Sequence, residues 1–114
     1  MNWVHIALTL AGGGALVVWV SALDRFVQRM HSHHRELWIS HGSPPGWCRV
    51  PEGSSWFGGS LARQRLLSAM AFSLPAWVVA DPVLKRQWVK LTAAHLFLCA
   101  VILWMVLNSL AVGA

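Results

Sequence analysis

Two long uncharged segments form the ends of the chain, and all formal charges lie between them. Residues 3–23 and 91–114 contain no Asp, Glu, Lys or Arg, whereas residues 24–90 contain all nine Lys and Arg residues and all four acidic residues. A hydrocarbon core about 30 Å thick is crossed by roughly 20 apolar helical residues. The pattern therefore predicts an all-α membrane protein, a two-span transmembrane helical hairpin with spans at residues 3–23 and 91–112.

The second long helix is predicted to begin before its apolar part. Asp81 can accept hydrogen bonds from the free amides of a first helical turn, and Pro82 suits the first helical position because its missing N–H is not needed there. Together they form a helix cap. The helix predicted over residues 82–112 therefore starts in water, with its basic residues solvated, and enters the membrane at about residue 91.

The first helix is predicted to continue past the membrane. Residues 24–38 contain no Gly or Pro and carry apolar residues at three-to-four spacing, which favours an amphipathic helical extension. Residues 39–60 are rich in Gly, Pro and Ser, which predicts an irregular connector. Gly42 and Pro44 are expected to turn the chain back toward the membrane, with Trp38 either packed under this turn or available as a docking surface.

Residues 61–80 predict a short interfacial or re-entrant helix. The apolar run at residues 66–80 is 15 residues long and contains Pro75, so it is short for a membrane span. A third crossing would also place the basic residues that follow Pro82 on the wrong side for the positive-inside rule. A helix lying in the interface and packed on the two spans is therefore favoured, with a third span as the alternative.

The charged middle of the chain predicts its orientation. The net charge is +5, and basic residues follow the first span and precede the second. The positive-inside rule then places residues 24–90 in the cytoplasm and both termini outside it. Cys48 in the connector and Cys99 in a span do not form a disulfide framework, which agrees with a reducing cytoplasmic side. No nucleic-acid-binding motif accompanies the charge, so the expected partner is the lipid bilayer.

Small residues on the first span favour contact with other helices. Ala7, Ala11 and Ala15 recur every four residues and so share one face, and Gly12 removes bulk at the same level. Such spacing lets another helix approach closely, although Gly and Ala are also common in membrane spans for other reasons. The pattern predicts packing against other integral membrane subunits.

Two sets of histidines are candidates for metal or cofactor chemistry. His31 and His34 share a face of the predicted helix, and imidazole suits zinc or copper, but no CxxC or HExxH motif accompanies them. They are weak metal candidates, and no metal is predicted. His95 is an ionisable residue inside a span, which is uncommon and favours a functional site. Its imidazole is expected to donate a structural hydrogen bond, to contact a partner helix, or to ligate a haem or chlorophyll-type pigment.

No catalytic set emerges from the sequence. Asp81 already has the cap role, and the other three acidic residues are scattered. The chain has no GxSxG nucleophile elbow, and no GxxxxGK[ST] or GxGxxG loop that would cradle a phosphate. The chain is therefore predicted not to be an enzyme, and no small-molecule substrate is identified.

The order of these elements resembles the universal stress protein B family of small bacterial inner-membrane proteins. The resemblance is carried by an N-terminal span, the element ELWISHGSP at residues 36–44, an apolar segment, an Asp-Pro-x-Leu helix start at Asp81, and a closing span. It implies a two-span protein of the bacterial cytoplasmic (inner) membrane with no assigned enzymatic activity, in which the charge pattern described above places both termini in the periplasm. The role that it implies is stress-related or accessory.

The function that the sequence favours is that of a non-catalytic accessory or structural subunit of a larger inner-membrane complex. Two spans alone offer little buried contact, and the first carries a small-residue face. The first alternative is a stand-alone stress-response membrane protein or homo-oligomer. The second alternative is a haem or chlorophyll-type carrier that binds its cofactor through His95.

Overall fold

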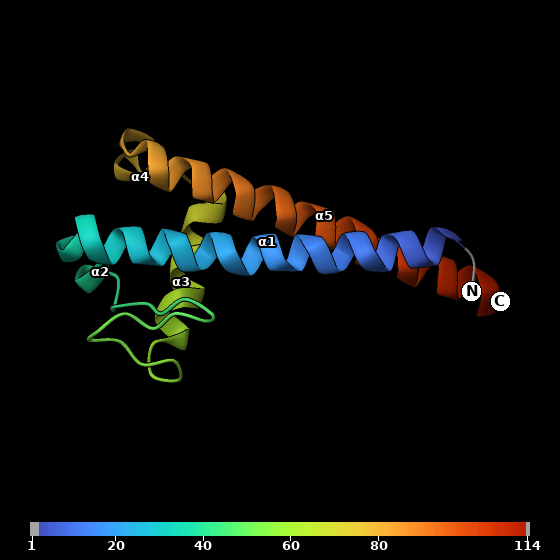
Figure 1. Ribbon diagram of the computed structural model, residues 1–114, viewed down its shortest axis with the longest axis horizontal. Helices are drawn as coiled ribbons and strands as arrows, with labels where there is room; N and C mark the ends of the chain where they lie inside the picture. The colour runs from blue at the N-terminus through green and yellow to red at the C-terminus, as the bar shows by residue number, and fades with distance from the viewer. Residues whose placement is uncertain (1–2, 114) are drawn as a thin grey trace.

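The computed structural model describes residues 3–113, apart from the side chain of Phe72, and every regular element in this range is a helix (Figure 1). The elements are α1 (Trp3–His33), α2 (Arg35–Ser40), α3 (Ser60–Phe72), α4 (Ala76–Ala80) and α5 (Pro82–Gly113). α1 and α5 lie side by side and run in opposite directions (Figure 1). The predicted all-α helical hairpin is confirmed. We call the part formed by residues 24–90 the head.

Both long helices are long and apolar enough to cross a membrane. α1 has 31 residues and α5 has 32, and each contains a window of high mean hydropathy, 2.0 in α1 and 2.3 in α5. A helix of this length extends about 45–48 Å, well beyond a hydrocarbon core about 30 Å thick. The head end of each helix therefore stands outside the apolar layer when the other end is embedded.

The two long helices contact each other through residues that repeat every seven positions. On α1 the buried or half-buried positions of this repeat are His5, Leu8, Gly12, Ala15, Trp19, Ala22 and Phe26. On α5 they are Leu84, Gln87, Leu91, Ala94, Leu98, Val101 and Asn108. This spacing is that of a coiled-coil seam, which keeps one face of each helix toward its neighbour. The approach is close, because a Cβ added to Gly12 would lie 3.8 Å from Val101 Cγ1.

The hydrophobic core lies in the head. The largest fully buried side chains include Trp38, Phe26, Leu23, Met30 and Leu84. They form one cluster with residues of α3 and α4, and fully burying such a side chain contributes about 1.5–3 kcal/mol. We call residues 3–23 and 91–113 the membrane half of the hairpin. Few of its side chains are buried within the protein, so the head supplies most of the apolar contact that holds the fold together.

The connector turns under Trp38. Trp38 Nε1 donates a hydrogen bond of 3.0 Å to the carbonyl oxygen of Pro44. Gly42 has a φ of 86°, in the left-handed region that favours glycine, and its amide bonds to Ile39 O at the end of α2. The ring of Trp38 also packs against Gly53. The turn that ends α2 and the indole beneath it therefore hold each other in place.

Asp24 ties the connector to α1. This carboxylate is buried, and its Oδ1 accepts hydrogen bonds from the amides of Trp47 (2.6 Å) and Cys48 (3.1 Å). On the other side, Arg63 Nη1 donates to Gly46 O at 3.0 Å, and the Arg63 guanidinium lies 3.9 Å from the centre of the Trp47 ring. The connector is thereby fixed between α1 and α3. The hydrogen bonds satisfy the buried charges of Asp24 and Arg63, and the cation–π contact adds an attraction between Arg63 and Trp47.

Two predicted helices differ from the structure. The helical extension predicted over residues 24–38 breaks at His34, whose φ of −133° is not helical, and continues as α2. The side chain of His34 bonds to Asp81 at this point, so a distant contact overrides the local helix preference. The single helix predicted over residues 61–80 is two helices separated by residues 73–75. Pro75 explains this break, because it lacks an N–H and disfavours a helical residue before it.

The alternative of a third span at residues 66–80 is not supported. α3 has 13 residues and α4 has five, and both are shorter than the roughly 20 residues that a crossing needs. α3 lies across the direction of α1, next to the head end of the hairpin (Figure 1).

Gly46 should be far less tolerant of a methyl group than Gly13. A Cβ at Gly46 would overlap Asp24 Oδ1 and approach Arg49 O, so Gly46→Ala should lower the free energy of unfolding by roughly 1–3 kcal/mol. A Cβ at Gly13 meets nothing within 4 Å, so Gly13→Ala should be neutral or stabilising by up to about 1 kcal/mol. Thermal unfolding in detergent, followed by tryptophan fluorescence, measures both. Equal midpoints for the two variants would contradict the role given to Asp24.

Candidate functional site

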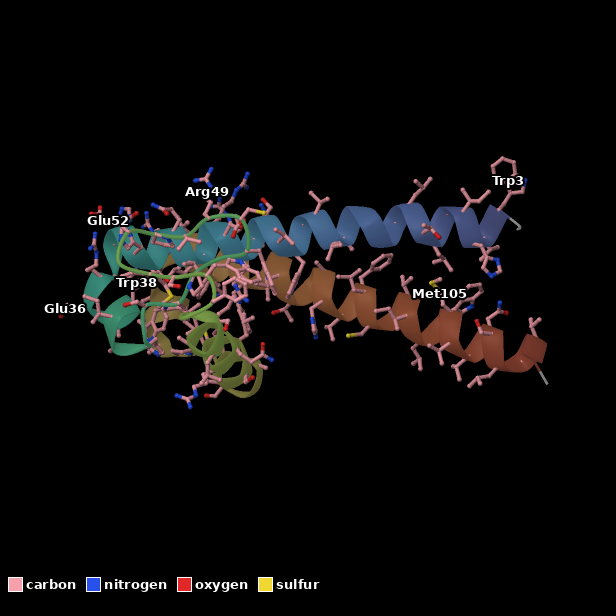
Figure 2. All side chains as sticks on the ribbon, turned by 90° about the horizontal axis from the view of Figure 1, so that it is seen from below. Trp3, Glu36, Trp38, Arg49, Glu52 and Met105 are labelled. Atoms are coloured by element: carbon pink, nitrogen blue, oxygen red, sulfur yellow. The ribbon has the colours of Figure 1, made fainter. Side chains whose placement is uncertain are left out.

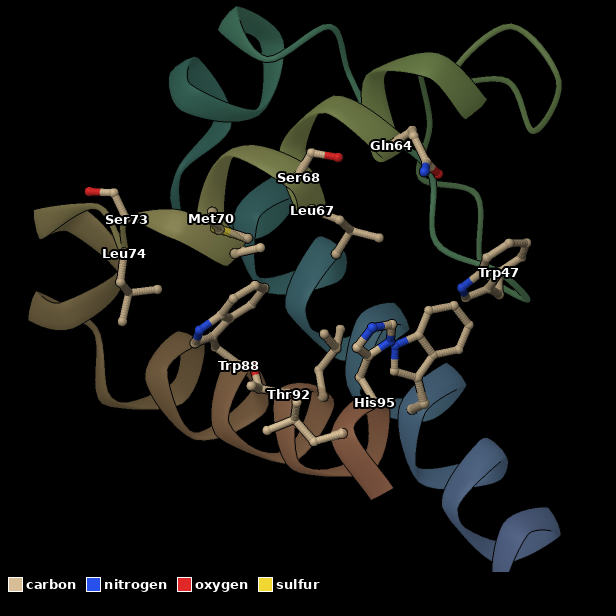
Figure 3. A pocket seen from close by; sticks show the side chains of 14 residues that line it. Trp47, Gln64, Leu67, Ser68, Met70, Ser73, Leu74, Trp88, Thr92 and His95 are labelled. Carbon is tan, nitrogen blue, oxygen red and sulfur yellow. The ribbon is translucent and has the colours of Figure 1, made fainter. Parts of the chain in front are cut away.

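A groove of about 660 Å³ lies between α3 and the junction of α1 with α5 (Figure 3). Its apolar wall includes Trp19, Trp47, Trp88, Leu67, Met70 and Leu91. Its polar residues are Gln64, Ser68, Ser73, Thr92 and His95. The volume and the mixture of many apolar groups with a few polar ones are typical of sites for small molecules or cofactors.

His95 lies at the edge of this groove (Figure 3). Its side chain is exposed, its Nε2 lies 3.7 Å from Cys99 Sγ one turn further along α5, and its ring centre lies 6.5 Å from that of Trp19. An imidazole in this position can donate a hydrogen bond, accept one, or ligate a metal ion of a cofactor. The groove thus places His95 beside an apolar wall and a few polar side chains of the protein.

His5 belongs to a different site. It lies at the other end of the hairpin, where its ring meets Trp104 edge-on at 5.5 Å and its Nε2 lies 3.3 Å from Asn108 Nδ2. This contact joins α1 to α5 near the chain ends, as polar pairs between membrane helices do. His5 and His95 therefore do not meet in one ligand set.

Three buried polar atoms in the groove wall have no hydrogen-bond partner among residues 3–113: Trp19 Nε1, Trp47 Nε1 and Thr92 Oγ1. Leaving such an atom unpaired costs about 1–3 kcal/mol.

The tryptophan wall was not predicted from the sequence. The available signal was the position of Trp19 and Trp88, which both lie within a few residues of the boundary between the apolar and charged segments.

Asp81 is the centre of a second polar cluster, which joins the two long helices. Its Oδ2 lies 2.7 Å from His34 Nε2 and 3.0 Å from Arg29 Nε, both on the α1 side. Its Oδ1 accepts hydrogen bonds from the amides of Val83 (3.0 Å) and Leu84 (3.4 Å), which is the cap interaction at the start of α5. Because a carboxylate only accepts hydrogen bonds, His34 donates from Nε2.

These contacts change the pKa of Asp81. Burial alone would raise it, but hydrogen bonds from His34, from Arg29 and from the amides of Val83 and Leu84 stabilise the charged form. The net effect holds the pKa of Asp81 well below its usual range. Asp81 therefore stays ionised and keeps its contacts across the physiological pH range.

The two weak metal candidates do not share a site. His34 is bonded to Asp81, whereas His31 Nε2 lies 3.2 Å from Glu52 O and the His31 ring meets Trp38 edge-on at 4.7 Å. Over the range that the structure describes, no group of three or more His, Cys, Asp and Glu side chains is arranged to hold a metal ion. Both histidines have contacts that organise the head.

The predicted small residues of α1 do not all face the same neighbour: some face α5 and others face outward. Gly12 and Ala15 belong to the seam with α5 and are half-buried. Ala7 and Ala11 are exposed, and a Cβ added to Gly14 would meet nothing within 4 Å. We call Ala7, Ala11 and Gly14 the outer small face of α1. The hairpin leaves this face uncovered.

Comparisons of the chain with protein-family models, with curated proteins and with solved structures found no match. The resemblance to the universal stress protein B family therefore stays a prediction from the residues that carry it.

Asp81→Asn should make stability less sensitive to acid. The pKa of Asp81 is lowered by folding, so its stabilisation is complete above the ordinary carboxyl pKa of about 3.9 and is lost as the pH falls below that value. Asn keeps an acceptor for the cap but loses the charge, so the variant should be about 2 kcal/mol less stable at pH 7. Melting curves in detergent from pH 7 to pH 3 measure the difference. The two proteins should converge as the pH falls below about 4, and parallel curves would contradict the role of the ionised group.

Proposed function

We propose that the chain is a non-catalytic accessory subunit of a larger assembly in a bacterial inner membrane. In this proposal the head lies in the cytoplasm and both termini lie in the periplasm. The basic residues that flank both candidate spans on the head side support this orientation.

The outer small face of α1 is the observation that carries the proposal. Membrane helices associate through close packing, since lipid tails are as apolar as the side chains they would replace. Small residues allow the closest approach, and the seam with α5 takes up Gly12, Ala15 and Ala22 but leaves Ala7, Ala11 and Gly14 uncovered. The outer small face gains little from lipid contact, whereas a helix of another subunit can pack tightly against it.

The use of the charged residues in the head supports a structural role. Asp24 holds the connector and Asp81 joins α1 to α5, so two of the four acidic residues are engaged in fold-stabilising contacts. Glu36 and Glu52 are exposed at the far end of the head (Figure 2). Among residues 3–113, no hydrogen bond or ion pair joins the carboxylate of Glu36 or Glu52 to another titratable side chain, as general acid–base catalysis would need. A well-ordered head on two spans suits a subunit that holds other subunits of a membrane assembly in place.

Ala11→Leu tests the proposal. A bulky side chain on the outer small face should prevent close packing, so the variant should lose most of the membrane subunits that co-purify with the wild-type chain. Ala100→Leu is the matched control, because Ala100 is an exposed alanine on α5 outside this face. Gentle detergent extraction followed by native gel electrophoresis and mass spectrometry measures the association.

Two results would count against an accessory subunit. Migration of the wild-type chain only as a monomer would remove the proposal. Migration only as a homo-oligomer that Ala11→Leu disrupts would favour the alternative in which the chain acts alone, for example as a stress-response membrane protein.

The second candidate function is binding of a haem or chlorophyll-type pigment through His95. It is favoured by the position of His95 beside an apolar groove of suitable size. In this case the purified protein should show a Soret or pigment absorption band, which His95→Ala should abolish and His5→Ala should retain. Protein purified from its native membrane without any such band would exclude this candidate.

A further inference from the structure

A second surface lies on α1 where the chain changes from apolar to charged. Two shallow grooves of about 550 Å³ and 310 Å³ adjoin there and share Val17, Ser21 and Arg25. Each groove has apolar side chains toward the membrane half of α1 and basic side chains toward the head. Together they form what we call the boundary surface.

Three basic residues from three different segments meet at the boundary surface. Arg25 comes from α1, Arg49 from the connector and Lys90 from α5. All three side chains are exposed, and the ion pairs found between residues 3 and 113 involve none of them. Their positive charge is therefore free to meet a negatively charged ligand.

Asp24 is the reason that Arg49 lies beside α1. Its carboxylate accepts hydrogen bonds from the amides of Trp47, Cys48 and Arg49, which brings the connector back against the helix. Figure 2 shows Arg49 next to α1 at the membrane side of the head. Asp24 also borders the larger groove, but these amides and the charge of Arg63 offset its negative charge. The side chains that face outward from the boundary surface are thus predominantly positive.

The apolar part of the boundary surface continues along the span. Leu16, Val17 and Val20 line the larger groove, and Val17 is 68% exposed. A hydrocarbon chain can lie along these three side chains. The charged group at the end of the same molecule would then lie beside Arg25, about one helical turn beyond Val20. Arginine binds phosphate through paired, charge-assisted hydrogen bonds.

We propose that the boundary surface binds an anionic phospholipid. Its phosphate accepts hydrogen bonds from Arg25 and Arg49, and one acyl chain lies along Leu16, Val17 and Val20. Lys90 extends the positive surface on the other side of Arg25, so a lipid with two phosphates binds more tightly than a lipid with one.

Lipid binding to the purified chain in detergent tests the proposal, with native mass spectrometry to count bound lipids. Diphosphatidylglycerol should bind best and phosphatidylglycerol next, with phosphatidylcholine about tenfold or more weaker than either. Inorganic phosphate at equal concentration should not displace the lipid, because it lacks the acyl chain. Displacement by phosphate alone would indicate an anion site and would overturn a lipid site, as would equal binding of phosphatidylcholine.

Variants distinguish a defined site from general charge attraction. Arg25→Gln and Arg49→Gln should each weaken phosphatidylglycerol binding about tenfold, whereas Arg86→Gln, which removes an exposed charge outside both grooves, should change it little. Arg49→Gln keeps the backbone amide that bonds to Asp24, so its melting temperature should match that of the wild-type chain. Val17→Phe should also weaken phosphatidylglycerol binding, because the larger side chain occupies the place of the acyl chain beside Leu16 and Val20. Equal effects of Arg49→Gln and Arg86→Gln would overturn the proposal.

Discussion

A buried carboxylate must be given hydrogen-bond donors, because an unpaired charge in an apolar environment costs several kcal/mol. This constraint acts twice in the head, at Asp24 next to the apolar part of α1 and at Asp81 before the first turn of α5. Asp24 is satisfied by amides of the connector, and Asp81 is satisfied by Arg29, His34 and the first turn of α5. Each carboxylate thereby joins segments that are far apart in the sequence. These two groups and the hydrophobic core together hold the segments of the head in place.

The consequence is a molecule with two unlike halves. The head has a hydrophobic core around Trp38, Phe26 and Leu23, and most of its charged groups that lie inward are paired. The membrane half is a single pair of helices with a narrow seam, and most of its side chains face outward. A stable head can therefore present an uncovered helix surface to lipids and to other proteins without losing its own fold.

The features that depend on residues close together in the sequence were predicted. The two spans follow from uncharged segments of sufficient length, and the start of α5 follows from the Asp81-Pro82 pair. Pro75 also signalled that the apolar run at residues 66–80 was not a span, although the division into α3 and α4 was not predicted. In these cases the physical cause lies within one or two helical turns of the effect.

Other features depend on contacts that no local pattern records. His34 bonds to a carboxylate 47 positions away, which explains why the predicted helix over residues 24–38 is interrupted. Asp24 meets the amides of Trp47 and Cys48 because the connector folds back, and the composition of residues 39–60 predicts only that they are irregular. The groove beside His95 depends on where α3 is placed, and its tryptophans come from three separate segments.

The seam between α1 and α5 has a consequence for how the protein is made. α5 follows every other described element, so α1 is synthesised before its neighbour. During that interval Gly12 and Ala15 lack their contacts with α5, and Asp81 is not yet available to Arg29 and His34. A chain that stopped before residue 82 would leave α1 without the helix that packs along its seam, so the finished hairpin depends on synthesis of its last element.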